Sequence, residues 1–213
     1  MKRIILILGV LFAAVSTARA QYDYPRFMGT VGVSYSPIFN VSMGGDAKER
    51  TYFNGVGLSW SNAHAVSTNK PFYVGYGLGI QYGWHMEKDE TVSTLTHNLS
   101  IKLPVEMLYR LETDFDLIII PRLGADVNFY PLYQAVGTMS TSSETKVVDW
   151  YDVEFEEGHH MNRVTLGLHV GARFQLDHFF VDLSYELPAV GLYYSKYVRM
   201  YERQIHVTAG FAF

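Results

Sequence analysis

The segment from Phe72 to Trp84 alternates between two kinds of side chain at every position, and this alternation constrains the fold more than any other feature. One face carries only large apolar residues: Phe72, Val74, Tyr76, Leu78, Ile80, Tyr82 and Trp84. The opposite face is rich in glycine: Tyr73, Gly75, Gly77, Gly79, Gln81 and Gly83. A period of two belongs to a β-strand, because a helix would scatter these residues around its axis. The run is longer than the ~5–6 residues of a typical soluble strand, so it predicts a strand that spans a membrane.

Seven further segments alternate apolar outward residues with small or polar inward ones: 27–35, 52–60, 94–110, 115–129, 163–175, 179–186 and 204–213. Together with 72–84 they give eight strands, and bacterial single-chain membrane barrels have an even number of strands. Closing the sheet also removes free edges, which cannot face hydrocarbon. The sequence therefore predicts an all-β fold, an eight-stranded antiparallel transmembrane up-and-down β-barrel.

The N-terminus has the three parts of a secretory signal peptide. Lys2 and Arg3 form a basic region, Ile4 to Val15 is apolar, and Ala18-Arg19-Ala20 supplies small residues for cleavage. The apolar run is shorter than the ~20 residues of a membrane-spanning helix, and no later stretch reaches ~18. We expect a cleaved signal peptide at 1–20 and an exported barrel domain at 21–213.

The composition bounds the function classes. The chain contains 0 Cys, so neither a disulfide nor a lipid anchor on cysteine is available. A net charge of −4 gives no sign of nucleic-acid binding through phosphates. Charged residues make up 18% and aromatic residues 15%, a balance that suits a lipid-facing surface. The length of 213 residues fits one domain, which we expect to be a monomer.

The inward faces of the later strands carry charges that balance one another. The cations are Lys102, Arg110, Arg122, Arg163 and Arg173, and the anions are Glu106, Asp116, Asp126, Asp182 and Glu186. Buried charges must be paired, since desolvation is expensive, and an eight-stranded barrel is just wide enough for side chains to fill it. We predict a salt-bridge network, joined by His169 and His206, that plugs the lumen against the glycine-rich wall. A narrow porin or small-solute channel is the alternative.

The connections predict an orientation. With the N-terminus in the periplasm, the outside segments are 38–50, 86–91, 130–161 and 189–202, and the inside segments are 62–71, 111–114 and 176–178. Alternation from Val147 to Glu156 predicts that the third outside segment protrudes as an acidic hairpin. Its exposed aromatic residues are candidate contacts for an extracellular protein partner: Trp150, Tyr151 and Phe155.

The signal peptide, the alternating strands and the terminal Ala209-Gly210-Phe211-Ala212-Phe213 resemble the small outer-membrane barrel superfamily of OmpA transmembrane domains and OmpX. The pieces 99–105, 121–125 and 179–185 look like its porin-family or PorT-like "outer membrane protein beta-barrel" members. The resemblance implies a bacterial outer membrane with its lipid and lipopolysaccharide as surroundings. It also implies that Phe213 belongs to the signal read by the barrel-assembly machinery. We expect no peptidoglycan-binding domain, and no residue supports a PorT-like role in secretion.

Two alternatives involve chemistry or metal. A lipid A-modifying barrel needs a nucleophile and a base within hydrogen-bond reach near the outer rim, and His97 is the only outward histidine on a predicted strand. No outward serine neighbours it, so we expect no catalytic residues. His159-His160 beside Glu156 and Glu157 offer ligand types, but two adjacent histidines are poor geometry for one ion. We predict a non-enzymatic protein without metal or cofactor, with a structural or surface-interaction role.

Overall fold

The computed structural model describes residues 24–44, 47–67, 69–139, 145–154, 160–194 and 198–213. Its eight long strands are β1 (Phe27–Gly44), β2 (Ala47–Ala65), β3 (Phe72–Lys88), β4 (Val92–Tyr109), β6 (Leu117–Met139), β8 (Val164–Leu176), β9 (Phe179–Val190) and β11 (Val198–Ala212). Three short strands accompany them: β5 (Leu111–Glu112), β7 (Thr145–Asp149) and β10 (Tyr193–Tyr194). The predicted signal peptide at 1–20 lies outside the described residues. Within the described ranges, no helix has the length and apolar character needed to cross a membrane.

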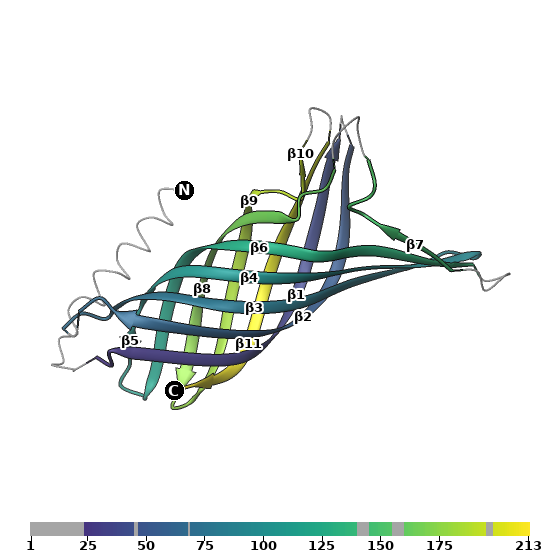
Figure 1. Ribbon diagram of the computed structural model, residues 1–213. Helices are drawn as coiled ribbons and strands as arrows, with labels where there is room; N and C mark the ends of the chain where they lie inside the picture. Colours follow the sequence, from purple (N-terminus) through teal and green to yellow (C-terminus); the bar gives the residue numbers. More distant parts are fainter. Residues whose placement is uncertain (1–23, 45–46, 68, 140–144, 155–159, 195–197) are drawn as a thin grey trace.

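The eight long strands form a closed ring, and each pairs antiparallel with the strands next to it in sequence order (Figure 1). β1 closes the ring because it pairs with both β2 and β11, so that Val31 lies opposite both Trp60 and Phe211. The short strands add to this ring: β5 and β7 pair with β6, and β10 pairs with β11. The predicted eight-stranded antiparallel up-and-down barrel is confirmed.

Most strands are longer than their sequence patterns indicated. β2 continues to Ala65, which shortens the segment 62–71 that had looked too long for an inner turn. At the other end, β2 and β3 stop pairing beyond Asn54 and Trp84, although both strands continue. The sheet therefore divides into two extensions (Figure 1). We call β1, β2, β10 and β11 beyond this level the first arm, and β3, β4, β6 and β7 the second arm.

A β-bulge at Pro131 changes which residues of β6 face the lumen. Leu99 of β4 lies opposite Leu132, whereas Ile101 lies opposite Phe129, so β6 has one extra residue between these pairs. Proline lacks the N–H that the ladder would use, which is why it is tolerated at a bulge. Because of the extra residue, Tyr130 and Tyr133 both point inward and are 2% exposed.

The outer surface of the ring is apolar on all eight strands. Large side chains that a soluble core would bury lie open on it, among them Leu58 at 64%, Val33 at 61% and Val105 at 60% exposure. We call this band the apolar belt. Inside, glycines of β3 let neighbouring backbone and side chains approach: a Cβ on Gly77 would lie 2.5 Å from the Trp60 carbonyl oxygen. An apolar outside with a crowded interior is what a membrane-spanning barrel needs.

The fifth predicted strand begins later than expected. Phe115 and Asp116 were assigned to it as outward and inward residues, but β6 starts at Leu117. Asp116 has φ 58°, in the left-handed region that aspartate tolerates in turns, and its side chain is exposed. The prediction that Asp116 faces the lumen is therefore wrong, because the tight β5–β6 turn occupies these positions.

Candidate functional site

The centre of the lumen is organised around the Arg122 guanidinium. It donates to the Glu106 carboxylate at 3.1 Å, to Asp182 at 2.6 Å and to the Ser184 hydroxyl at 3.0 Å. Arg173 lies on the other side of Asp182, with Nε 3.4 Å from Oδ2, and its guanidinium covers the Phe180 ring. The Glu106 and Asp182 side chains are 1% exposed, so their charges depend on these two arginines.

His169 joins the same network between two carboxylates. Its Nδ1 lies 2.7 Å from Asp126 and its Nε2 lies 3.2 Å from Glu106. Ionised carboxylates only accept hydrogen bonds, so a ring that satisfies both must donate from both nitrogens and is then an imidazolium. With that proton, the lumen holds four cations (Lys102, Arg122, Arg173 and His169) against four anions (Glu106, Asp126, Asp182 and Glu186).

A second cluster lies nearer the outer end of the lumen and centres on Glu186. Its carboxylate pairs with Lys102, accepts from Asn128 Nδ2 at 2.7 Å, and lies 3.3 Å from His206 Nε2. The other His206 nitrogen contacts the Ser36 hydroxyl at 2.7 Å, which ties β11 to β1. The structure thus brings together seven of the ten charged residues predicted for the lumen, with both predicted histidines.

Three of the ten predicted lumen charges lie outside the central network. Asp116 is in the exposed turn described above, while Arg110 pairs with Glu112 at 2.8 Å at the inner rim. Arg163 precedes β8 at the outer end, is exposed, and stacks 4.1 Å from the centre of the Tyr151 ring. For Asp116 and Arg163 the lumen assignment is wrong, because both are exposed where a strand begins. Arg110 contacts Met28 at the inner end of the lumen, but its ion pair lies outside the central network.

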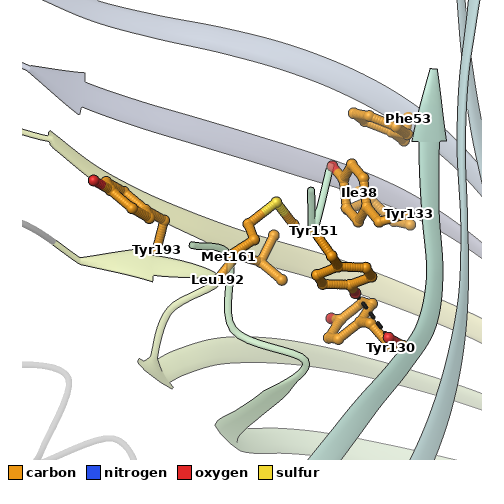
Figure 2. Packing of buried hydrophobic residues seen from close by; sticks show 8 residues of the cluster. All are labelled: Ile38, Phe53, Tyr130, Tyr133, Tyr151, Met161, Leu192 and Tyr193. Carbon is orange, nitrogen blue, oxygen red and sulfur yellow. Dashed lines mark hydrogen bonds between the residues drawn. The ribbon is translucent and has the colours of Figure 1, made fainter. Parts of the chain in front are cut away.

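An aromatic cluster covers the outer end of the lumen (Figure 2). We call it the outer cap; its buried members are Ile38, Phe53, Tyr130, Tyr133, Tyr151, Met161, Leu192 and Tyr193. They come from both arms and from the segments between β7, β8 and β10. The Tyr151 hydroxyl donates to the Tyr130 carbonyl at 2.7 Å, which fixes the returning chain over the barrel mouth.

The outer cap corrects one sequence prediction. Tyr151 was expected to be an exposed contact, but it is 7% exposed because the chain turns back after β7 and packs it into the cap. Trp150 is partly buried against the same cluster, and Phe155 lies outside the described residues. Of the predicted protruding hairpin, the described residues show β6 paired with β7, from Gln134 opposite Asp149 to Thr138 opposite Thr145.

Glu202 is a buried acid between the charged lumen and the outer cap, and it had been assigned to an outside segment. Glu202 lies next to Arg203 on β11, in the direction of the outer end, and Arg203 is the first charged outward residue of β11 above the apolar belt. Its carboxylate accepts from the Tyr130 hydroxyl at 2.5 Å and from Asn98 Nδ2 at 3.2 Å. Burial raises the pKa of Glu202 to about 7. The inward parity of His206 and Gln204 extends to Glu202, and this signal would have identified it.

An apolar cluster also closes the inner end of the lumen: Met28, Ala63, Tyr73, Leu108 and Ile120. Between the two clusters lies a cavity of about 100 Å³, bounded by the glycine-bearing strands on one side and by Arg122, Lys102 and Asp182 on the other. A cavity of that size holds a few water molecules.

The described residues contain no group of three or more histidine, cysteine, aspartate or glutamate side chains arranged to hold a metal ion. His160 is exposed, whereas His159, Glu156 and Glu157 lie outside the described ranges. His97 faces outward beside the Tyr82 ring at 5.8 Å, and its Nδ1 has no hydrogen-bond partner in the described part of the chain. The described residues therefore place no nucleophile next to His97.

Phe213 ends the ladder that closes the barrel. Its N–H donates to the Gly29 carbonyl at 2.9 Å, and its own carbonyl accepts from the Gly29 N–H at 2.8 Å. The ring covers Gly29, where any larger residue would meet it. The role of Phe213 in barrel assembly stays a prediction.

A scan against protein-family models and a search of curated proteins gave no match. Among solved structures, the chain is similar to Ail, the attachment invasion locus protein of Yersinia pestis, with 13% identity, 89% of this chain and 100% of that chain covered, and a TM-score of 0.46. It is similar to Neisserial surface protein A with 10% identity, 88% and 96% coverage, and a TM-score of 0.44.

The β-barrel domain of Pseudomonas aeruginosa OprF is also similar, with 12% identity, 87% and 99% coverage, and a TM-score of 0.34. The assignment of this chain to the class of closed eight-stranded barrels follows from its own strand pairing.

Proposed function

We propose that this protein is a non-enzymatic outer-membrane β-barrel with a closed lumen, whose function lies in its outer surface. The apolar belt supports the membrane placement, since side chains such as Leu58 and Val105 would be in contact with water around a soluble barrel. The two arms, which extend beyond the apolar belt (Figure 1), support a structural or surface-interaction role outside the membrane.

The observation that carries the closed lumen is that packed side chains block it at both ends. Apolar clusters lie at both ends, and the charges between them pair across the barrel rather than line an open path. A water-filled channel would instead run past Arg122 and Lys102 without interruption to both ends of the barrel. The cavity of about 100 Å³ is the part of the interior that favours the alternative function, a narrow porin for small solutes.

Planar-bilayer conductance of the refolded protein tests the proposal. We expect no steady current from the wild-type barrel. The double variant Tyr130→Ala/Tyr151→Ala removes two rings of the outer cap. Comparing its current with that of the wild type shows whether the outer cap limits the passage of ions. A steady, ion-selective current from the wild type would establish the narrow porin instead.

The non-enzymatic part of the proposal has its own test at His97. Overexpression should leave the mass spectrum of lipid A unchanged, and His97→Ala should make no difference. A lipid A mass shift that disappears in His97→Ala would replace the proposal with a lipid A-modifying enzyme.

A further inference from the structure

A shallow hollow interrupts the lipid-facing side of the barrel across β8, β9 and β11. It has a volume of about 360 Å³ and is lined by Val170, Leu183, Tyr185 and Ile205. The register brings these residues together, because Tyr185 lies opposite both Val170 and Ile205. The hollow faces away from the lumen, and its apolar walls and position in the belt fit a hydrocarbon chain.

A basic residue lies directly beyond this hollow. Arg203 is two residues past Ile205 on the same face of β11, so strand geometry places it about 7 Å further toward the outer end. Its side chain is exposed, and no carboxylate in the described ranges lies within ion-pair distance of it. The apolar hollow and Arg203 together match the two ends of an amphiphile, an acyl chain and an anionic headgroup.

Two further arginines extend the basic surface over the first arm. Arg203 lies opposite Phe39, which lies opposite Tyr52, and Arg50 is two residues beyond Tyr52 on the same face. Arg199 lies on β11 beyond Arg203 and stacks on Tyr194, with its guanidinium 4.8 Å from the ring centre. We call Arg50, Arg199 and Arg203 the arginine face.

The arginine face has no acidic side chain among its described outward residues. Glu202, the neighbour of Arg203 along the chain, points inward and is buried. The second arm differs, since its β3–β4 end exposes three acids, Glu87, Asp89 and Glu90, around a single lysine, Lys88. Beside the hollow, the described outward charges are therefore all positive, whereas the second arm carries both signs, with Lys88 and Lys146 also exposed. Arginine binds phosphate through two parallel hydrogen bonds, so a phosphate group is an anion that this surface can bind.

We propose that the hollow and the arginine face form a binding site for one phosphate-bearing glycolipid of the outer leaflet, lipid A. One acyl chain lies in the hollow along Leu183 and Ile205, and a headgroup phosphate contacts Arg203. Arg50 and Arg199 add attraction for the remaining anionic groups. The inference rests on the proposed membrane placement and deepens it, because it names the lipid and its position on the barrel.

The test is lipid retention by the full-length mature protein. The refolded barrel is mixed in detergent with bisphosphorylated lipid A, with chemically dephosphorylated lipid A, or with phosphatidylglycerol, and bound lipid is counted by native mass spectrometry. The variants are Arg203→Gln for the headgroup and Leu183→Trp to fill the hollow. The matched controls are Arg26→Gln, an exposed arginine at the inner end, and Val181→Trp, an equally exposed belt residue on β9.

We expect the wild type and both controls to retain one bisphosphorylated lipid A. Arg203→Gln should weaken retention roughly ten-fold, the effect of losing one charged hydrogen-bonding group, and Leu183→Trp should weaken it as well. Equal retention by either variant and its control would overturn the proposal, as would equal retention of dephosphorylated lipid A or of phosphatidylglycerol. A barrel that inserts into vesicles without retaining lipid A contradicts only this inference, whereas failure to insert contradicts the proposed function itself.

Discussion

Replacing Arg122 by methionine should be the most damaging single change in the lumen. Methionine keeps much of the side-chain volume but leaves Glu106 and Asp182, each 1% exposed, without their shared cation. Breaking a buried ion pair by removing one partner typically costs about 3–5 kcal/mol. Arg173 and His169 remain near the two acids and will offset part of this cost, so we expect a loss of about 3 kcal/mol in the free energy of unfolding.

The assay is urea unfolding of the barrel in phospholipid vesicles, followed by tryptophan fluorescence. Arg110→Met is the matched control, because Arg110 forms its ion pair with the partly exposed Glu112 at the inner rim and should lose about 1 kcal/mol or less. Adding Asp182→Asn to Arg122→Met should recover part of the loss, since it removes one uncompensated charge. Equal, small losses in Arg122→Met and Arg110→Met would refute the reasoning, because they would mean that water already solvates Glu106 and Asp182.

Two further predictions concern the outer end and the glycine-bearing wall. Burial holds the pKa of Glu202 at about 7, against 4.5 for a free glutamate. The protonated side chain therefore stabilises the fold fully below pH 4.5, and this stabilisation is lost as the pH rises to about 7. The free energy of unfolding should fall by about 3 kcal/mol over this range. Glu202→Gln should therefore flatten this part of the pH profile of unfolding, and an unchanged profile would show that Glu202 is ionised and solvated. Gly77→Ala should destabilise the barrel by about 1–3 kcal/mol, because the added Cβ would press on the Trp60 carbonyl. Gly79→Ala should leave stability unchanged or slightly higher, because its Cβ would lie 3.5 Å from Lys102, an ordinary contact distance. Similar effects at both positions in the same urea assay would contradict the close packing of β2 against β3.

The strand positions could be predicted because the lipid-facing pattern has a period of two wherever the chain crosses the belt. Phe72 to Trp84 is the clearest case, and β3 contains all of it. The extensions beyond the belt could not be predicted in the same way, since lipid does not contact them and the regular apolar alternation ends. The divided arms depend on where β2 and β3 separate, which is a property of pairing and not of either strand alone.

The lumen was partly predictable for the same reason. Lys102, Glu106, Arg122 and Glu186 share the inward parity of regular strands, and the structure brings them together. Tyr133 has the parity of Phe129 and would be assigned to the lipid side, but the bulge at Pro131 reverses it. Arg110, Asp116 and Arg163 have inward parity as well, yet they lie where the strands end, and parity carries no information about strand ends.

The apolar belt should contact lipid while the outer cap does not, and the native tryptophans test this directly. Trp60 faces outward on β2 at 42% exposure, whereas Trp150 packs against the outer cap. Two single-tryptophan variants, one keeping Trp60 and one keeping Trp150, are refolded into vesicles whose acyl chains carry bromine, a contact quencher of tryptophan fluorescence. We predict strong quenching of Trp60 and little quenching of Trp150. Little quenching of Trp60, or equal quenching of both, would contradict this prediction.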